Sequence, residues 1–233
     1  MNKQHNWDTF ISLGYGQKSV FKKNKVLFHQ GEAGKGFYYL IEGEVKISVI
    51  SNEGHERDID YVTPGELIGV QGLKNDPYTY TAKTTDLSTV YFFSNQTLNQ
   101  LIADIPEASN TFIDSLITKV QLLAETISLL NAPAEYRLAH FLYKIHLKTN
   151  KSTIRISQTS LSRYIGTSRI TVYKIFKQLE QDRVLEFKNR EIELLDINKL
   201  KTFLNSFLQL SPEQDTEQPL EAMNNKNTPI RKI

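Results

Sequence analysis

Basic and polar side chains recur at helical spacing in a short stretch near the C-terminal end of the sequence. The apolar residues of 169–181 fall on one face of a helix and predict its buried side: Val172, Ile175, Phe176 and Leu179. The opposite face carries Arg169, Ile170, Tyr173, Lys174 and Lys177. Arg169 can donate two hydrogen bonds to guanine O6 and N7, whereas Ile170 offers only apolar contact, for example to a thymine methyl. Lys174 and Lys177 suit phosphate, so this face predicts contact with DNA.

The segments around this helix form a recognisable unit. A helix at Gln158–Tyr164, a turn at Ile165-Gly166-Thr167 and the helix N-cap Ser168 come before it, and a hairpin over 184–195 follows. This order predicts a winged helix-turn-helix. A winged helix used for protein contact is the alternative, which the basic face disfavours. The predicted DNA contacts are Gln158, Ser168, Arg169, Ile170, Thr171, Tyr173, Lys174, Lys177 and the wing residues Lys188 and Arg190, with Ser162 and Arg163 as further backbone clamps.

The charge distribution agrees with a polyanionic partner. Residues 1–110 hold 10 Lys and Arg against 13 Asp and Glu, whereas residues 131–210 hold 14 against 7. The overall net charge of +2 therefore conceals a basic C-terminal part near +7. Such an excess indicates nucleic acid or, alternatively, a solvated basic surface.

Other kinds of chemistry find little support. The chain has no cysteine, which excludes disulfides, thiolate metal sites, Cys-ligated iron–sulfur clusters and Cys nucleophiles. The five histidines are scattered, and none has the spacing of a haem or metal ligand: His5, His29, His55, His140 and His146. A polar start and the lack of a membrane-spanning apolar run predict a cytoplasmic protein without membrane contact. We expect no enzyme activity and no metal.

The N-terminal part is predicted to be β-structure. Four runs rich in β-branched and aromatic residues predict strands at Phe37–Ile41, Val45–Ile50, Ile59–Val62 and Thr89–Phe93. Glycines recur between strands, and Asn52-Glu53-Gly54 predicts a hairpin turn. Alternation over 45–49 predicts one buried and one solvent-exposed face.

A long helix is predicted between the two parts, from Pro106 to Pro133. Its apolar residues include a 4-3-4-3 series typical of a two-helix seam: Ile113, Ile117, Val120, Ala124 and Ile127. Packing on its own domain is the alternative. We favour a homodimer seam, with the other flank of the helix on the β-domain. Further helices are predicted at Ala134–Leu147 and Lys199–Leu210, and a short strand at Ile154–Ile156.

Together these elements predict an α+β chain in four parts. They are an antiparallel β-roll sensor domain over 1–108, a dimerisation helix over 109–131, a winged helix-turn-helix over 132–210 and a flexible tail over 211–233.

This order resembles the Crp/Fnr family of bacterial transcription regulators over about residues 18–200. Four segments carry the resemblance: Phe28-His29-Gln30-Gly31-Glu32, Phe37-Tyr38-Tyr39-Leu40-Ile41-Glu42-Gly43, Pro64-Gly65-Glu66-Leu67-Ile68-Gly69 and Gly166-Thr167-Ser168-Arg169-Ile170-Thr171-Val172. The resemblance implies a cyclic-nucleotide-binding-like β-roll and a homodimer that binds a near-palindromic double-stranded DNA site. It also implies an allosteric effector in the β-roll, and contact with RNA polymerase if the protein is an activator.

The β-roll departs from the branches of the family with known effectors. The cyclic-nucleotide branch has a Glu shortly after the glycine matching Gly69, but Val70 and Gln71 stand here. It also has an Arg before Ser or Thr, yet no Arg lies between Gly69 and Ala82, and the adenine contacts are replaced by Leu122 and Leu123. These departures disfavour cAMP, and the missing cysteines exclude the iron–sulfur branch.

What remains is a mostly apolar pocket with two phenol hydroxyls. The predicted pocket residues are Leu67, Gly69, Val70, Gln71, Tyr78, Tyr80, Leu122 and Leu123. The stretch from Gly65 to Tyr80 resembles the branch that senses halogenated phenolic acids. A small non-nucleotide organic effector is predicted. The alternatives are a cAMP-responsive regulator with an atypical pocket, a ligand-independent regulator and, in another class, a cupin-like metalloenzyme, which would need a His-x-His cluster that is absent.

The recognition helix departs as well. The usual family pattern has a Glu where Ile170 stands and an Arg where Lys174 stands. Glu accepts a hydrogen bond from cytosine N4 and Ile cannot. We therefore expect a half-site that is A·T-rich at that step.

Overall fold

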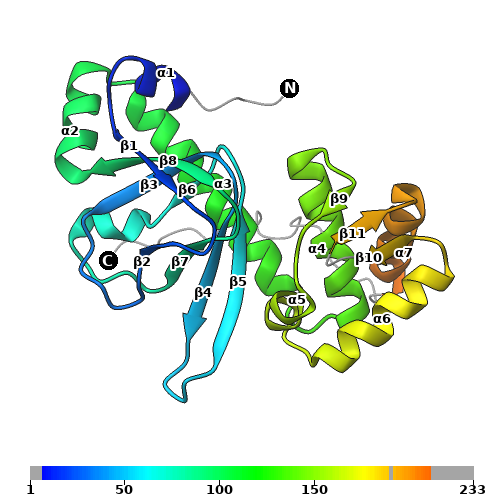
Figure 1. Ribbon diagram of the computed structural model, residues 1–233. Coiled ribbons are helices and arrows are strands. Elements are labelled where there is room, and N and C mark those ends of the chain that lie inside the picture. Colours follow the sequence, from blue (N-terminus) through cyan, green and yellow to red (C-terminus); the bar gives the residue numbers. More distant parts are fainter. Residues whose placement is uncertain (1–6, 189–190, 211–233) are drawn as a thin grey trace, which may run out of the picture.

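The computed structural model describes residues 7–188 and 191–210. Figure 1 shows a β-roll flanked by short helices, a long helix running along it, and a second, mainly helical body beside it. This confirms the α+β class and the order of β-roll, long helix and winged helix-turn-helix. Arg190, His5 and the tail at 211–233 lie outside the described residues.

The β-roll consists of two antiparallel four-stranded sheets with the strand orders β1-β8-β3-β6 and β2-β7-β4-β5. The strands are β1 (Gln17–Phe21), β2 (Val26–Phe28), β3 (Gly36–Glu42), β4 (Val45–Ile50), β5 (Glu56–Val62), β6 (Leu67–Ile68), β7 (Thr81–Thr84) and β8 (Ser88–Ser94). The four strands predicted from sequence are confirmed, and so is the turn, since the Gly54 amide donates to the Ser51 carbonyl. The shorter strands β1, β2, β6 and β7 were not predicted.

Two hydrophobic clusters hold the β-roll together. Between the sheets lie Phe28, Leu40, Val45, Ile47, Val62, Ile68, Tyr78, Ala82 and Val90. Outside them, Trp7 of α1 (Trp7–Ser12) is fully buried against Phe37 and Phe93, beside α2 (Asn95–Asp104). The aromatic surface of these rings fixes both short helices on the roll.

The long helix α3 spans Ala108–Ser128. It is shorter than predicted from Pro106 and Pro133, because residues 129–132 form a turn in which the Ala132 amide donates to the Leu129 carbonyl. One side of α3 meets the β-roll, where the Trp7 indole donates to the Ser115 hydroxyl over 3.0 Å. The predicted placement of this flank on the β-domain is therefore confirmed.

The C-terminal body has one core of its own. Its elements are α4 (Ala134–Thr149), β9 (Thr153–Ile154), α5 (Gln158–Ile165), α6 (Arg169–Gln181), β10 (Leu185–Lys188), β11 (Glu191–Leu194) and α7 (Ile197–Leu210). The predicted helix at Ala134–Leu147 is confirmed as α4, and the large apolar residues of one of its faces are buried: Tyr136, Leu138, Phe141, Leu142 and Ile145. Strands β10, β11 and β9 form the antiparallel wing sheet.

One residue of the β-roll belongs to the core of this second body. Tyr61 of β5 is 3% exposed, and its ring centroid lies 5.5 Å from that of Phe141 and 5.8 Å from that of Tyr164. Helix α5 packs on β5 around it. The two bodies therefore share a hydrophobic contact.

This contact overturns the predicted solvent-exposed face of β4. Lys46 is 9% and Ser48 is 3% exposed, because the outer face of β4 and β5 is covered where α5 packs on β5. The Lys46 ammonium lies 2.9 Å from Oδ1 of Asp58, whose side chain is fully buried. Burial raises the pKa of Asp58 despite this ion pair.

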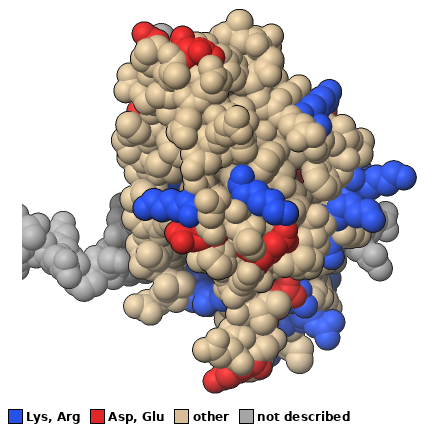
Figure 2. All heavy atoms as spheres, turned by 90° about the vertical axis from the view of Figure 1, so that its left-hand side faces the viewer, with Lys and Arg blue, Asp and Glu red and all other residues tan. Residues whose placement is uncertain are grey.

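Figure 2 shows the face of the β-roll on the left-hand side of Figure 1. Basic side chains lie across its middle and along its right edge, and acidic ones lie at its top, just below the basic ones in the middle, and at its bottom. The net negative charge of residues 1–110 is thus not a single acidic patch on this face.

Removing the buried ammonium should destabilise the fold. We expect Lys46→Met to lower the free energy of unfolding by roughly 3–5 kcal/mol, because it leaves the Asp58 carboxylate buried without its cation. Thermal and urea unfolding of the full chain measure this. Lys18→Met, at an exposed position of β1, is the matched control and should change little. A loss below about 1 kcal/mol for Lys46→Met would contradict this account of the buried pair.

Candidate functional site

Helices α5 and α6 are built by local hydrogen bonds at their ends. Ser168 has an extended backbone, and its side chain accepts from the Thr171 amide over 3.0 Å, which confirms the predicted N-cap. Ser157 caps α5 in the same way. Gly166 adopts the left-handed conformation with φ 71°, which a residue with a side chain adopts only at a cost. The sharp turn between the helices depends on it.

Helix α6 presents the predicted face to solvent. Its apolar side is buried in the core, whereas Ile170 is 69% and Tyr173 is 50% exposed. Arg169, Lys174 and Lys177 are exposed as well. The structure therefore brings together the side chains expected to read DNA, at the free N-terminal half of one helix. Thr171 is only half-buried beside them, with its hydroxyl 2.9 Å from that of Ser168.

The basic groups of this surface differ in their partners. Lys177 lies 2.8 Å from Oε2 of Glu180, and this hydrogen bond raises the pKa of Lys177. Lys188 pairs with Glu186 in the wing. Within residues 7–188 and 191–210, Arg169 and Lys174 have no ion-pair partner, so their charges are available to a ligand. Gln158 is half-buried at the start of α5.

Two of the expected backbone clamps are occupied in this arrangement. Arg163 forms an ion pair with the β-roll, 2.7 Å from its Nη1 to Oε2 of Glu56. Ser162 is 7% exposed and donates to the Thr159 carbonyl. Both side chains have partners within the chain because α5 is packed against β5, and their contact with the DNA backbone stays a prediction. The helix-turn-helix turn is also close to the roll, since a Cβ on Gly166 would lie 3.4 Å from the Arg57 guanidinium.

A cavity of about 300 Å³ lies between the β-roll and α3. Six of the predicted pocket residues line it: Leu67, Val70, Gln71, Tyr80, Leu122 and Leu123. The remaining lining residues are Ile47, Ile59, Asp60, Gly65, Glu66, Thr79, Ser115, Leu116, Thr118 and Lys119.

Two predicted pocket residues belong to the core instead. The Tyr78 ring stacks on Phe28 with centroids 3.7 Å apart, and its hydroxyl donates to the Gly36 carbonyl over 2.9 Å. Gly69 packs under the same rings, where a Cβ would come within 2.9 Å of Phe28. The pocket therefore has one phenol hydroxyl, from Tyr80, which accepts from the Gly69 amide. Stacking on Phe28, which is distant in sequence, holds the Tyr78 ring in the core and away from the cavity.

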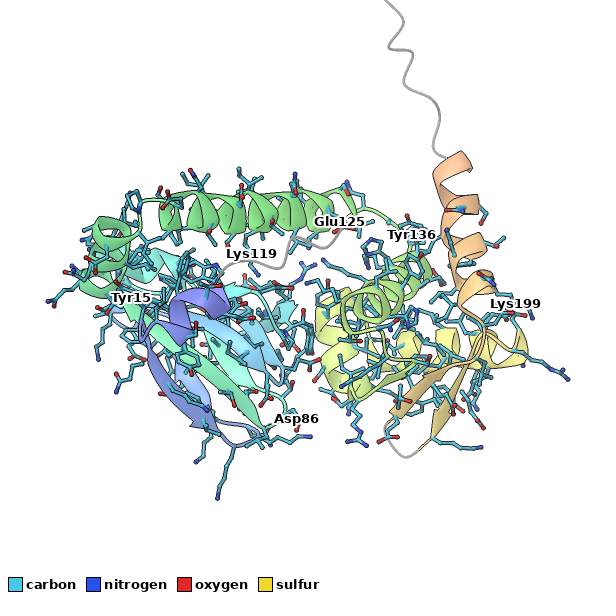
Figure 3. All side chains as sticks on the ribbon, turned by 90° about the horizontal axis from the view of Figure 1, so that it is seen from above. Tyr15, Asp86, Lys119, Glu125, Tyr136 and Lys199 are labelled. Carbon is cyan, nitrogen blue, oxygen red and sulfur yellow. The ribbon has the colours of Figure 1, made fainter. Side chains whose placement is uncertain are left out.

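The charged part of the cavity was missed by the sequence analysis. Lys119 of α3 lies 2.6 Å from Oδ2 of Asp60 and 3.7 Å from Oε2 of Glu66. Figure 3 shows Lys119 on the side of α3 that faces the β-roll. Burial opposes ionisation of Asp60, yet Lys119 and Lys148 hold its pKa below the usual range. A single lysine on the flank of an apolar stripe was the signal that could have identified this group.

The charged groups of the cavity also contact the DNA-binding part of the chain. Glu66 Oε1 accepts from the Thr63 hydroxyl over 3.0 Å and from the ammonium of Lys148, which lies in the last turn of α4. Glu66 thus contacts the cavity with one oxygen and α4 with the other. A second pair, near the C-terminal end of α3, joins α3 to α4, since Glu125 lies 3.0 Å from His140. Burial lowers the pKa of His140, and Glu125 opposes this shift.

The described residues contain neither a cluster of metal-binding side chains nor a membrane-spanning helix. In residues 7–188 and 191–210, no three His, Asp or Glu side chains come together to hold a metal ion. Within the same ranges, no helix has the length and apolar character that crossing a membrane requires.

Comparison with protein families matches both parts. The cyclic nucleotide-binding domain matches residues 18–104, and the Crp-like helix-turn-helix domain matches residues 136–203. Together these segments cover more than half of the 233 residues.

Individual proteins agree with these matches. The transcriptional activator protein Anr of Pseudomonas protegens is 22% identical over 183 residues, which is 75% of each chain. The cAMP-activated global transcriptional regulator CRP of Salmonella typhimurium is 24% identical over 74% of this chain and 86% of its own. The structure of FixK2 from Bradyrhizobium japonicum shares the fold, with a TM-score of 0.71, 17% identity and coverage of 80% of this chain and 96% of that one. The present chain therefore belongs to the Crp/Fnr family of DNA-binding transcription regulators.

Proposed function

We propose that this regulator acts as a homodimer that binds near-palindromic double-stranded DNA, one α6 helix per half-site, under the control of a small non-nucleotide effector in the β-roll. The observation that carries the proposal is the exposure of an apolar face on α3 and of a basic face on α6. In this proposal residues 1–108 sense, 109–131 dimerise and 132–210 bind DNA. If the protein is an activator, RNA polymerase is a further partner.

The outer side of α3 supports the homodimer. Five large apolar side chains along it are 49–65% exposed, and Leu130 in the turn that follows is 45% exposed; the five are Ile113, Ile117, Val120, Leu123 and Ile127. Ala124 lies exposed among them. In Figure 3 this side of the helix points away from both bodies of the chain. A continuous apolar stripe on a long helix needs a partner, and a second copy of the same stripe supplies one with two-fold symmetry.

The exposed face of α6 supports the DNA contacts. A helix of this kind inserts its N-terminal residues into the major groove. Arg169 is placed for a base edge, Lys174 and Lys177 for phosphate, and Ile170 for an apolar base surface. Lys188 extends the basic surface into the wing, and Arg190 was assigned there from sequence.

The cavity supports an effector other than a cyclic nucleotide. Its one ammonium, Lys119, is already paired with Asp60, and a phosphate placed there would also face Glu66. A buried anion beside two carboxylates is strongly disfavoured. The apolar residues of the cavity instead suit a small organic molecule.

Charge placed in the α3 stripe should separate the dimer. We expect Val120→Lys to convert the protein to a monomer by analytical ultracentrifugation. Its affinity for a palindromic site should fall by about 10²-fold or more, because the second half-site no longer adds to the first. Val20→Lys makes the same change at an equally exposed valine, 60% against 64%, on the β1 edge, and should have no effect. A Val120→Lys protein that remained dimeric would contradict the seam.

Selection from random DNA should reveal how α6 reads its site. We expect an A·T-rich step opposite Ile170, and Ile170→Glu should introduce a G·C pair there. Arg169→Ala should cost about 1–3 kcal/mol at one base position, whereas Lys174→Ala should weaken all sequences alike and reduce the salt dependence. Recovery of a G·C step by the natural chain would overturn the role of Ile170. The absence of DNA binding at low salt would overturn the proposed function.

A further inference from the structure

We infer that the cavity of the β-roll takes a neutral, largely apolar molecule with one hydroxyl group, and that this hydroxyl bridges the Lys119 ammonium and the Glu66 carboxylate. The inference rests on the proposed effector function and specifies its ligand class.

Most polar groups that line the cavity already have partners. Gln71 donates to Thr79, the Tyr80 hydroxyl accepts from the Gly69 amide, Thr118 donates to the Asp114 carbonyl, and Ser115 both donates to the Thr111 carbonyl and accepts from Trp7. Oε2 of Glu66 differs from them. It is buried, and no hydrogen bond reaches it within the described part of the chain. A buried carboxylate oxygen without a donor is costly, so a ligand that donates to it gains binding energy.

Lys119 supplies the second half of the site. Its ammonium has three donors, and Asp60 at 2.6 Å accepts one of them. The 3.7 Å separation from Glu66 Oε2 is too long for a hydrogen bond. Oε2 has almost no accessible surface, so a ligand reaches it when the Glu66 side chain turns toward the cavity, and an oxygen between the two groups then lies about 2.8 Å from each. A hydroxyl there accepts from Lys119 and donates to Glu66, which no carboxylate ligand and no ammonium ligand can do at once.

Charge selects against ionic ligands. Two carboxylates, Asp60 and Glu66, line the cavity with one ammonium, and Lys148 balances the set from outside it. An anionic ligand would meet both carboxylates, and a cationic ligand would lie next to Lys119. In a half-enclosed apolar cavity either charge would be desolvated with like charge nearby. A neutral group avoids both costs, and the volume of about 300 Å³ suits a molecule with a single ring.

A ligand bound at this site affects the DNA-binding part of the chain through Glu66. A donor on Oε2 withdraws negative charge from the carboxylate whose Oε1 accepts from Lys148 of α4. The bound ligand therefore changes the strength of a contact between the β-roll and the second body.

Four one-ring probes of similar size test the ligand class: toluene, benzyl alcohol, benzoate and benzylamine, the last two charged at pH 7. Calorimetric titration and thermal unfolding of the full chain measure binding. We expect benzyl alcohol to bind about tenfold more tightly than toluene, through hydrogen bonds to charged groups, and benzoate and benzylamine to bind more weakly than either.

Substitutions of the two charged groups test whether they hold the hydroxyl group of the ligand. Glu66→Gln and Lys119→Met should each remove most of the advantage of benzyl alcohol over toluene. Glu53→Gln, at a side chain 82% exposed in the β4–β5 turn, should leave it unchanged. If a variant fails to fold, the binding of the four probes to the natural chain still tests the inference.

Three outcomes would overturn the inference: tighter binding of benzoate or benzylamine, equal binding of benzyl alcohol and toluene, or no binding of benzyl alcohol. DNA binding is measured on the same preparation. If a palindromic site is bound while one of these outcomes occurs, the ligand class fails and the DNA-binding function stands.

Discussion

Helix α3 packs on the β-roll with one side and exposes an apolar face on the other, all within 21 residues. The arrangement of both bodies depends on this helix. Its inner side meets the β-roll through Ser115, Leu116 and Lys119 and closes the cavity. Its outer side leaves an apolar stripe in water. A stripe of this size is costly to expose, and the helix that carries it also lines the cavity.

The charges around Lys119 explain why this inner side is not simply hydrophobic. Asp60, Glu66 and Lys148 come from β5, from the loop after it and from α4. Each group is partly buried, so their mutual attraction is screened less than that of surface pairs. Removing one member leaves the others with unbalanced charge, which makes the cavity and α4 interdependent.

The range of each interaction decides what could be predicted. The start of helix Arg169–Gln181 was predictable to the residue and its end closely, because its cap, its preceding glycine turn and its periodicity are local in sequence. Lys46 was not, since alternation places it in solvent and only the distant α5 covers that face. Tyr78 stacks on a ring from a different strand, and Lys119 has the sequence context of an ordinary surface lysine. Contacts between distant segments carry no periodic signal.

The contact between the β-roll and the C-terminal body is held by interactions of small free energy. The Arg163–Glu56 ion pair is 39% and 34% exposed, and pairs of this kind contribute at most about 1 kcal/mol. Tyr61 adds the burial of one aromatic ring, about 1.5–3 kcal/mol for a side chain of this size, and Lys148 of α4 adds an ion pair to Glu66. A ligand that binds one arrangement only tenfold to a hundredfold more tightly supplies a comparable free energy. Because Arg163 lies in α5 and Tyr61 packs against Tyr164 of the same helix, a modest difference in the affinity of a ligand for the two arrangements would be sufficient to alter how the DNA-binding helices are held.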